Sequence, residues 1–384
     1  MNDLPMAENR DLAWELIRQQ GESIALDATF AVTSQRTVEA VLRHPDVFSS
    51  KRAFDALNSP IPMPPLTFDP PEQTRFRRIL QPFFSPRAIR PLEPVLRRHV
   101  VDLIEPLVER GECDFVADVA VPFPVQTFLT FFGLPMDHLD QFLVWKDAIL
   151  DQSDPQGAGK EDADAGHAVA LFTYLGELVA RRRGVPGEDI LSALLCAEGD
   201  DAMTDEEVVG LCFLFVLAGL DTVTGALGMG MERLAKSPEH QRELAGDPGL
   251  VPAAVEELVR LDPPAPFTPR VTTRAAVVDG HTVPEASMVS AYLAVANRDE
   301  ALRRDPLVMD FHRGENPHAS FGLGVHRCLG AHLARLEMAI VYEEWHKRIP
   351  SYEVAPGTTP RVKWPRGTLE LESLRLRFPA GGAG

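Results

Sequence analysis

Residues 321–330 read FGLGVHRCLG and place one cysteine and one histidine among three glycines. A helical pattern overlaps the end of this stretch, with apolar residues at helical spacing at Leu329, Leu333, Leu336 and Ile340. Cys328 therefore lies where a helix begins. Free backbone N–H groups and the positive end of the helix dipole favour a thiolate at such a position.

The glycines in this stretch predict a surface with few side chains. Gly322 and Gly324 allow a sharp bend and a close approach of the backbone to another group. Gly330 leaves out a side chain near the start of the helix, which suits a flat group lying against it. A thiolate beside such a surface is typical of a haem held by cysteine. The alternative is a buried structural cysteine beside a glycine turn, which is common for free cysteines.

The spacing Phe-Gly-x-Gly-x-His-x-Cys-x-Gly resembles the haem-binding signature of the cytochrome P450 family at every fixed position. The resemblance implies a mainly α fold with a minor β region, in which a triangular helical domain surrounds a buried haem b. Cys328 would be the metal ligand. The other residues of this stretch that would bind the cofactor are Phe321, Gly322, His326, Leu329 and Gly330.

Residues 208–231 form a long apolar segment in which Asp221 is the only charged residue. The segment is long enough to cross a bilayer, which needs about 20 apolar residues. Residues 204–207 before it form an acidic capping box, and neither end has a Lys/Arg cluster or aromatic anchors. A helix that is apolar on all sides can also be the central helix of a large core. We favour this interpretation.

Within that helix, residues 218–222 read AGLDT and resemble the acid–alcohol segment of the family. The resemblance implies that Ala218 and Gly219 contact the cofactor. It also implies that Asp221 and Thr222 are catalytic and relay protons into a dry pocket. The alternative is a Thr222 hydroxyl that bonds back to a carbonyl of its own helix.

Glu257 and Arg260 form a Glu-x-x-Arg pair whose spacing places both side chains on one helix face. Such a pair, taken alone, is usually exposed and contributes little to stability. The resemblance implies instead a buried structural pair that fixes the loop before the cysteine.

Arg77, Arg270 and His326 match family positions that bind the two haem propionates, which need donors where they lie near apolar surface. Gln73 stands where many bacterial members have histidine, and it can donate a hydrogen bond without carrying a charge. The alternative for Arg77 is a solvated basic helix face, because two further arginines lie within two positions of it.

The chain shows no linker, repeat or low-complexity tract, so we expect one domain over residues 1–384. Helical patterns predict a core over about 70–262 and 328–350, because apolar residues recur there at helical spacing. Alternating patterns predict small β-rich parts over about 23–34, 270–295 and 361–378.

The formal net charge of −18 disfavours nucleic acid and anionic membranes as partners. The N-terminal stretch MNDLPMAENR has neither the basic nor the apolar region of a secretion signal. The four cysteines do not form a disulfide framework, and no pair has zinc-site spacing. We expect a reduced, cytoplasmic protein, and a monomer because that is the usual state in the family.

The resemblance implies a monooxygenase that inserts one oxygen atom of O2 into a C–H bond. The family-like pocket positions are apolar, which favours a small hydrophobic substrate, terpenoid-like or aromatic. These positions are Leu214, Leu217, Phe267 and, in the irregular loop 51–68, Ile61 and Met63. The likeness is nearest to the camphor-hydroxylating members, but loop 51–68 contains no tyrosine that could bond a ketone.

No dinucleotide-binding fingerprint is present, so the resemblance implies a separate ferredoxin as the electron donor, docking on the Cys328 side. A basic patch could receive it, although these side chains could equally be ordinary solvated arginines. The candidate patch is Arg75, Arg78, Arg327 and Arg335.

Two other functions stay open on the same fold. Members that use peroxide or isomerise their substrate often lack the acid–alcohol pair, which is intact here. A haem carrier or sensor would need a distal ligand, and residues 208–222 contain no histidine or methionine. Both observations favour the monooxygenase.

Overall fold

The long apolar segment of the sequence becomes α10 (Asp205–Ala235), a helix of 31 residues. It begins at the predicted capping box, in which Thr204 Oγ accepts a hydrogen bond from Glu207 N at 3.1 Å and Glu207 Oε2 accepts one from Thr204 N at 2.8 Å. Its most apolar window is long enough to span a membrane, but 72% of that window is buried inside the protein. α10 is therefore built as a core helix, as the sequence predicts.

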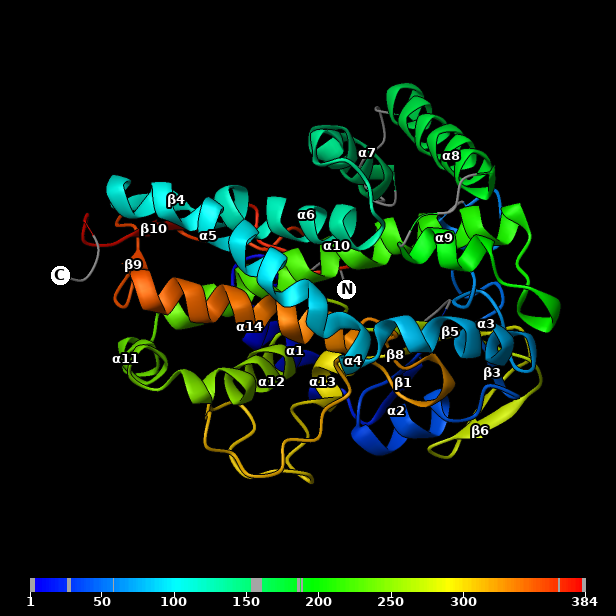
Figure 1. Cartoon of the computed structure of the whole chain (residues 1–384). Coiled ribbons are helices and arrows are strands. Elements are labelled where there is room, and N and C mark those ends of the chain that lie inside the picture. The colour runs from blue at the N-terminus through cyan, green and yellow to red at the C-terminus, as the bar shows by residue number, and fades with distance from the viewer. Residues whose placement is uncertain are drawn as a thin grey trace.

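The computed structural model describes residues 4–25, 29–57, 59–152, 161–184, 187, 189–364 and 367–381. Figure 1 shows α10 passing through the middle of a helical body, with the small strands of the largest sheet gathered at one side. The other helices are α1 (Arg10–Arg18), α2 (Gln35–Leu42), α3 (Glu72–Leu80), α4 (Pro86–Ile89), α5 (Glu93–Arg110), α6 (Pro122–Phe131), α7 (Leu139–Gln152), α8 (Glu161–Gly184), α9 (Ile190–Leu195), α11 (Pro238–Gly246), α12 (Val251–Leu261), α13 (Leu293–Ala296) and α14 (Ala331–Arg348).

The strands form one larger sheet and two small ones. The larger sheet has the order β1 (Ser23–Ala25), β2 (Thr29–Val32), β8 (Met288–Ala291), β5 (Thr268–Thr272) and β3 (Phe48–Ser49), with only β2 and β8 parallel. A second sheet joins β4 (Glu112–Asp114), β10 (Arg375–Arg377) and β9 (Glu353–Val354). The third is the hairpin of β6 (Ala276–Val278) and β7 (His281–Val283).

The turn between β6 and β7 lies where the sequence predicts it. Asp279 and Gly280 connect its strands with φ values of 51° and 78°, which is the left-handed region that a two-residue turn of this kind requires. The strand that forms within residues 361–378 is shorter than the alternating pattern of the sequence predicts. Of the described residues there, β10 and an isolated bridge between Val362 and Leu371 are paired.

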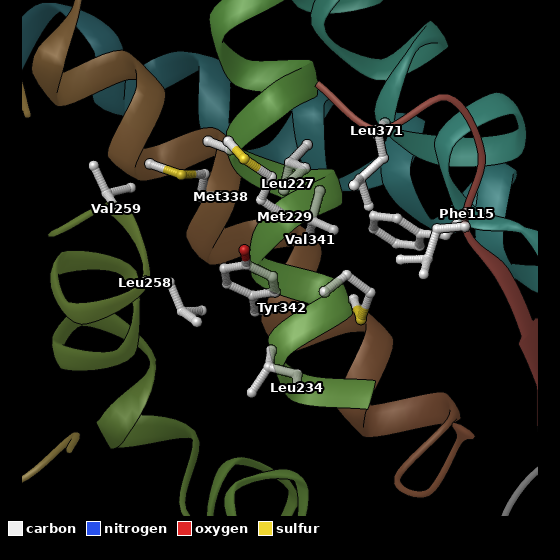
Figure 2. Close-up of a cluster of buried hydrophobic side chains, with 14 of the residues drawn as sticks. Phe115, Leu227, Met229, Leu234, Leu258, Val259, Met338, Val341, Tyr342 and Leu371 are labelled. Carbon is white, nitrogen blue, oxygen red and sulfur yellow. The ribbon is translucent and has the colours of Figure 1, made fainter. Parts of the chain in front are cut away.

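The core around α10 brings together helices far apart in the sequence. In Figure 2, Leu227, Met229 and Leu234 of α10 meet α14 and α12 side chains. These include Met338, Val341 and Tyr342 of α14, and Leu258 and Val259 of α12. All of these side chains are buried. This packing fixes α14, and with it the loop that carries Cys328, relative to α10.

Candidate active site

Cys328 lies in a tightly bonded loop directly before α14. Its backbone N–H donates to the carbonyl of Phe321 at 2.7 Å. Gly322 and Gly324 adopt φ values of 67° and 69°, where side chains are disfavoured. A Cβ on Gly324 would also lie 2.3 Å from the carbonyl oxygen of Leu42 in α2. The glycines therefore let the loop bend and pack against α2, and this places the sulfur.

The helix start differs slightly from the expectation. α14 begins at Ala331 with Gly330 as its N-cap, so Cys328 precedes the cap by two residues. The Cys328 side chain is exposed to the cavities, yet desolvation by the surrounding protein raises the pKa of its thiol, while the backbone N–H of Gly330 and the charge of Arg77 act in the opposite direction. In the protein alone, the helix start does not outweigh this desolvation. A metal cation bonded to the sulfur would supply the missing stabilisation of the thiolate.

The Cys328 side chain faces two connected cavities. The larger has a volume of about 530 Å³ and extends between α10, β5 and residues 367–368. The smaller, of about 240 Å³, extends between α10, α6 and the start of α14. The residues that line both are Leu66, Leu214, Ala218, Thr222, Val223, His326, Cys328 and Ala334. The sulfur thus lies at the junction of a space for a large flat group and a space for a second molecule.

Two glycines leave room at this junction. Gly219 in α10 and Gly330 at the start of α14 both line the smaller cavity. A Cβ added to either would meet no atom within 4 Å beyond its neighbours. The walls on both sides are therefore open toward the space beside the sulfur, as a planar cofactor requires.

Arg270 and His326 give one end of the larger cavity an affinity for anions. The Arg270 side chain is buried, and its described partners are Thr268 Oγ1 at 3.2 Å and the Pro269 carbonyl at 2.7 Å, without a carboxylate. Burial lowers the pKa of Arg270 to about 10. His326 Nε2 is buried and has no hydrogen-bond partner among the described residues. A carboxylate on a bound cofactor would satisfy both groups, so the residues present fit a haem.

Arg77 and Gln73 both reach the cysteine loop from α3. Arg77 lines the smaller cavity and donates to the carbonyl of Arg327 at 2.7 Å. Gln73 donates to the carbonyl of Val325 at 2.6 Å and lines neither cavity. The structure thus places the Gln73 amide on the loop, where it positions the backbone beside His326.

The acid–alcohol pair is split between two environments. Thr222 lines both cavities, and its hydroxyl donates to the carbonyl of Ala218 at 2.7 Å. This is the local hydrogen bond left open as an alternative, and it coexists with a position on the cavity wall. Asp221 is 1% exposed and lines neither cavity. It accepts a hydrogen bond from Thr368, which does line the larger one.

The apolar pocket positions divide by element. Leu214, Leu217 and Phe267 line the larger cavity, and Leu214 also lines the smaller one. Ile61 and Met63 line neither. Met63 N donates to Thr67 Oγ1 at 2.9 Å, and this turn buries the Met63 side chain in the core. The loop instead contributes Phe54, Leu57 and Leu66 to the larger cavity.

Glu257 and Arg260 form a fully buried ion pair. The Arg260 guanidinium donates two hydrogen bonds of 2.7 Å to the two carboxylate oxygens of Glu257. Burial alone would raise the pKa of Glu257, but Arg260 and Arg313 hold it below its usual value. The carboxylate also accepts from Asp310 N at 3.1 Å and Asn316 Nδ2 at 3.0 Å.

This pair is connected to the cysteine loop through Asn297, which the sequence analysis did not identify. Arg260 donates to the carbonyl of Asn297 at 3.1 Å. The Asn297 amide donates to Ser320 Oγ at 2.7 Å and accepts from Ala319 N at 2.7 Å. Ser320 directly precedes Phe321, so the network ends at the start of the loop.

A buried acid, Glu337, was also missed. It lies on α14 and lines the smaller cavity, and burial raises its pKa to about 8, so it carries a proton at neutral pH. Its Oε2 has no hydrogen-bond partner among the described residues. The sequence does contain a signal for it, because a glutamate four residues after Leu333 lies on the otherwise apolar stripe of that helix.

The proposed basic patch is wrong for three of its four arginines. Arg75 pairs with Glu207 at 2.9 Å, Arg78 with Asp201 at 2.6 Å, and Arg335 with Glu256 at 2.8 Å. Arg335 also lies over the Phe321 ring, 4.1 Å from its centroid. Arg327 is exposed and has no ion-pair partner within the described part of the chain.

A family model described as Cytochrome P450 matches residues 179–247 and 249–345. The chain is 36% identical to the probable cytochrome P450 127A1 of Sinorhizobium fredii, covering 86% of this chain and 79% of that protein. It is 39% identical to the erythromycin C-12 hydroxylase of Saccharopolyspora erythraea, covering 80% of this chain and 78% of that protein.

Solved structures give the same likeness over almost the full length. The open form of cytochrome P450 Eryk from S. erythraea has a TM-score of 0.87 at 33% identity, covering 96% of this chain and 95% of that one. CYP109B1 from Bacillus subtilis has a TM-score of 0.87 at 28% identity, covering 97% and 100%. The mainly α fold predicted from the cysteine signature is confirmed.

Proposed function

Because the chain belongs to the cytochrome P450 family and is therefore a haem-b monooxygenase, we propose that it oxidises a small hydrophobic molecule held in the larger cavity. The observation that carries this proposal is the Cys328 sulfur at the junction of the two cavities. The residues assigned to the cofactor line both cavities, so the cofactor would take up the parts of both that lie nearest the sulfur, and the apolar remainder of the larger cavity would hold the substrate.

The cofactor would be held from several sides. Cys328 would bind the iron, and Arg77, Arg270 and His326 would face the propionates. The remaining wall would come from Ala218, Gly219, Phe321, Gly322, Leu329 and Gly330. The haem supplies the redox chemistry of O2, and a thiolate ligand favours O–O bond cleavage.

The chain's own residues keep the cavity dry and supply protons. The walls of the larger cavity are mostly apolar, from α10, the 51–68 loop and Phe267. Thr222 is the hydroxyl on the α10 wall, one residue from the buried carboxylate of Asp221. We assign Thr222 the transfer of protons into the cavity and Asp221 their supply.

Replacing Thr222 with alanine tests this assignment and the reaction class together. Substrate binding should persist, while the fraction of reducing equivalents recovered as product should fall about tenfold or more, because general acid catalysis typically contributes at least about a hundredfold. Thr224→Val is the matched control, because Thr224 lies on the same helix outside both cavities. Unchanged product per reducing equivalent in Thr222→Ala would remove Thr222 from the relay.

The substrate proposed is terpenoid-like or aromatic. The larger cavity has a volume of about 530 Å³, of which the haem would take up a part, and the mostly apolar wall of the remainder suits a small hydrophobic molecule. Two relatives are named for their substrates, as an erythromycin C-12 hydroxylase and a nocardicin C N-oxygenase, and the likeness to the camphor-hydroxylating members rests on the sequence pattern alone.

Electrons would come from a separate ferredoxin that docks beside the cysteine loop. Arg327 in that loop and Arg87 and Arg90 at α4 are exposed and have no ion-pair partner within the described residues. α4 contacts α14, which follows Cys328. These three arginines replace the earlier patch as the proposed docking surface. We further propose that the enzyme acts as a monomer in the cytoplasm.

Reversing the charge in Arg327→Glu should slow haem reduction by an acidic ferredoxin about tenfold or more at low salt, because charge complementarity raises association rates. Stopped-flow measurement of the reduction rate checks this. Arg78→Glu is the control, because it makes the same change of net charge at an arginine outside the proposed docking surface. Equal slowing in both variants, or in neither, would contradict a docking surface at Arg327.

A further inference from the structure

Thr368 is a polar side chain on the wall of the larger cavity that the mechanism above does not use. It lines the cavity beside α10 and donates its hydroxyl proton to a carboxylate oxygen of Asp221. Thr368 belongs to the segment 367–371. Thr368 and Asp221 are 147 positions apart in the sequence.

The backbone around Thr368 is fixed against α10. Gly225 lies one turn after Asp221, and a Cβ there would be 2.1 Å from the carbonyl oxygen of Leu369. The N–H of Leu369 donates to the carbonyl of Pro264 at 2.7 Å. Thr368 is thus held from both sides, and its hydroxyl stays between the carboxylate and the cavity.

The direction of these hydrogen bonds determines what the wall can offer a ligand. A threonine hydroxyl has one proton and two acceptor sites, whereas ionised carboxylates and carbonyls only accept. Thr368 gives its proton to Asp221, and Thr222 gives its proton to the Ala218 carbonyl at 2.7 Å. In this resting arrangement both hydroxyls present acceptors to the cavity, and Thr222 could pass a proton on only by turning away from the Ala218 carbonyl.

The other polar side chains of the larger cavity do not change this conclusion. Ser320 donates to the Val259 carbonyl at 2.8 Å and accepts from Asn297 at 2.7 Å. Thr268, Arg270 and His326 carry possible donors, but they lie at the end assigned to the propionates. On the substrate side, the cavity is an apolar space with acceptors at Thr222 and Thr368.

We propose that the cavity selects substrates carrying a hydroxyl over the corresponding ketones, and that Thr368 is the residue that accepts this hydrogen bond. The proposal rests on the proposed function and narrows its substrate class to apolar alcohols, phenols included. A ketone oxygen would meet acceptors and leave its own lone pairs unsatisfied, which should weaken binding about tenfold.

The test uses the holoenzyme and matched pairs of ligands that share one apolar skeleton, such as a bicyclic terpene alcohol and its ketone. Titration by the haem spectral shift gives a Kd for each. The alcohol should bind about tenfold more tightly in the wild type. Thr368→Val should lower the ratio severalfold, because Thr222 is then the one acceptor left on the substrate side. Thr368→Ser should keep the ratio, and Thr368→Asn, which adds an amide donor, should shift it toward the ketone.

Thr268→Val is the control and should leave the ratio unchanged, because its hydroxyl lies at the other end of the cavity. Ketones that bind as well as alcohols in the wild type, binding of neither member, or a preference as large in Thr368→Val as in the wild type would each overturn the proposal. The reduced carbon monoxide spectrum separates this from a failure of the proposed function. A thiolate-type band with no alcohol preference contradicts the role of Thr368 only, and absence of the band contradicts the haem site itself.

Discussion

Replacing Cys328 with histidine is expected to abolish the red-shifted band of the reduced carbon monoxide complex that marks a thiolate ligand. A neutral imidazole donates less electron density than a thiolate, so O–O bond cleavage should fail as well. We expect product formation to fall by more than the roughly 10–100-fold that loss of an outer partner of a metal ligand typically costs. The spectrum and the rate of product formation are both measured on the purified variant.

The matched control is Cys196→His, because Cys196 is an exposed free cysteine outside both cavities. It should keep the band and the activity of the wild type. A thiolate-type band that survives in Cys328→His would show that another residue holds the iron, and the proposed function would then lose its main support.

The features that the sequence predicts correctly are those set by short-range geometry. The capping box of α10 needs only four consecutive residues, and the turn at Asp279 and Gly280 needs two. The family resemblance implies the wall positions on α10, and helical spacing puts them on one face, since Leu217 and Ala218 follow Leu214 by three and four positions and Thr222 follows Ala218 by four. Each of these depends on neighbours that the sequence shows directly.

The features that it misses depend on partners far along the chain. The 51–68 loop has no periodicity, so nothing in the sequence indicates that Leu66 turns toward the cavity while Met63 turns into the core. The pairing of Arg75 with Glu207 joins residues 132 positions apart. Charged residues of this kind look solvated in sequence until the fold brings a carboxylate beside them.

Replacing Glu257 with alanine is expected to lower the free energy of unfolding by about 3–5 kcal/mol, because the Arg260 guanidinium would stay buried without its charge partner. Asn316 Nδ2 and the N–H of Asp310 would lose their acceptor too. Since Arg260 reaches the cysteine loop through Asn297, the loop should also hold the cofactor less firmly. Denaturant titration and the haem content of the purified variant measure the two effects.

The adjacent Glu256→Gln is the matched control on the same helix. Its side chain is 30% exposed and accepts hydrogen bonds from Arg335 and His318, and glutamine keeps an amide oxygen as acceptor, so this change should cost clearly less than the loss of the fully buried Glu257. If both variants lost the same stability, general disruption of α12 would explain the result. If Glu257→Ala lost stability but kept its full haem content, the ion pair would contribute to stability only. The connection through Asn297 would then not control the geometry of the cysteine loop.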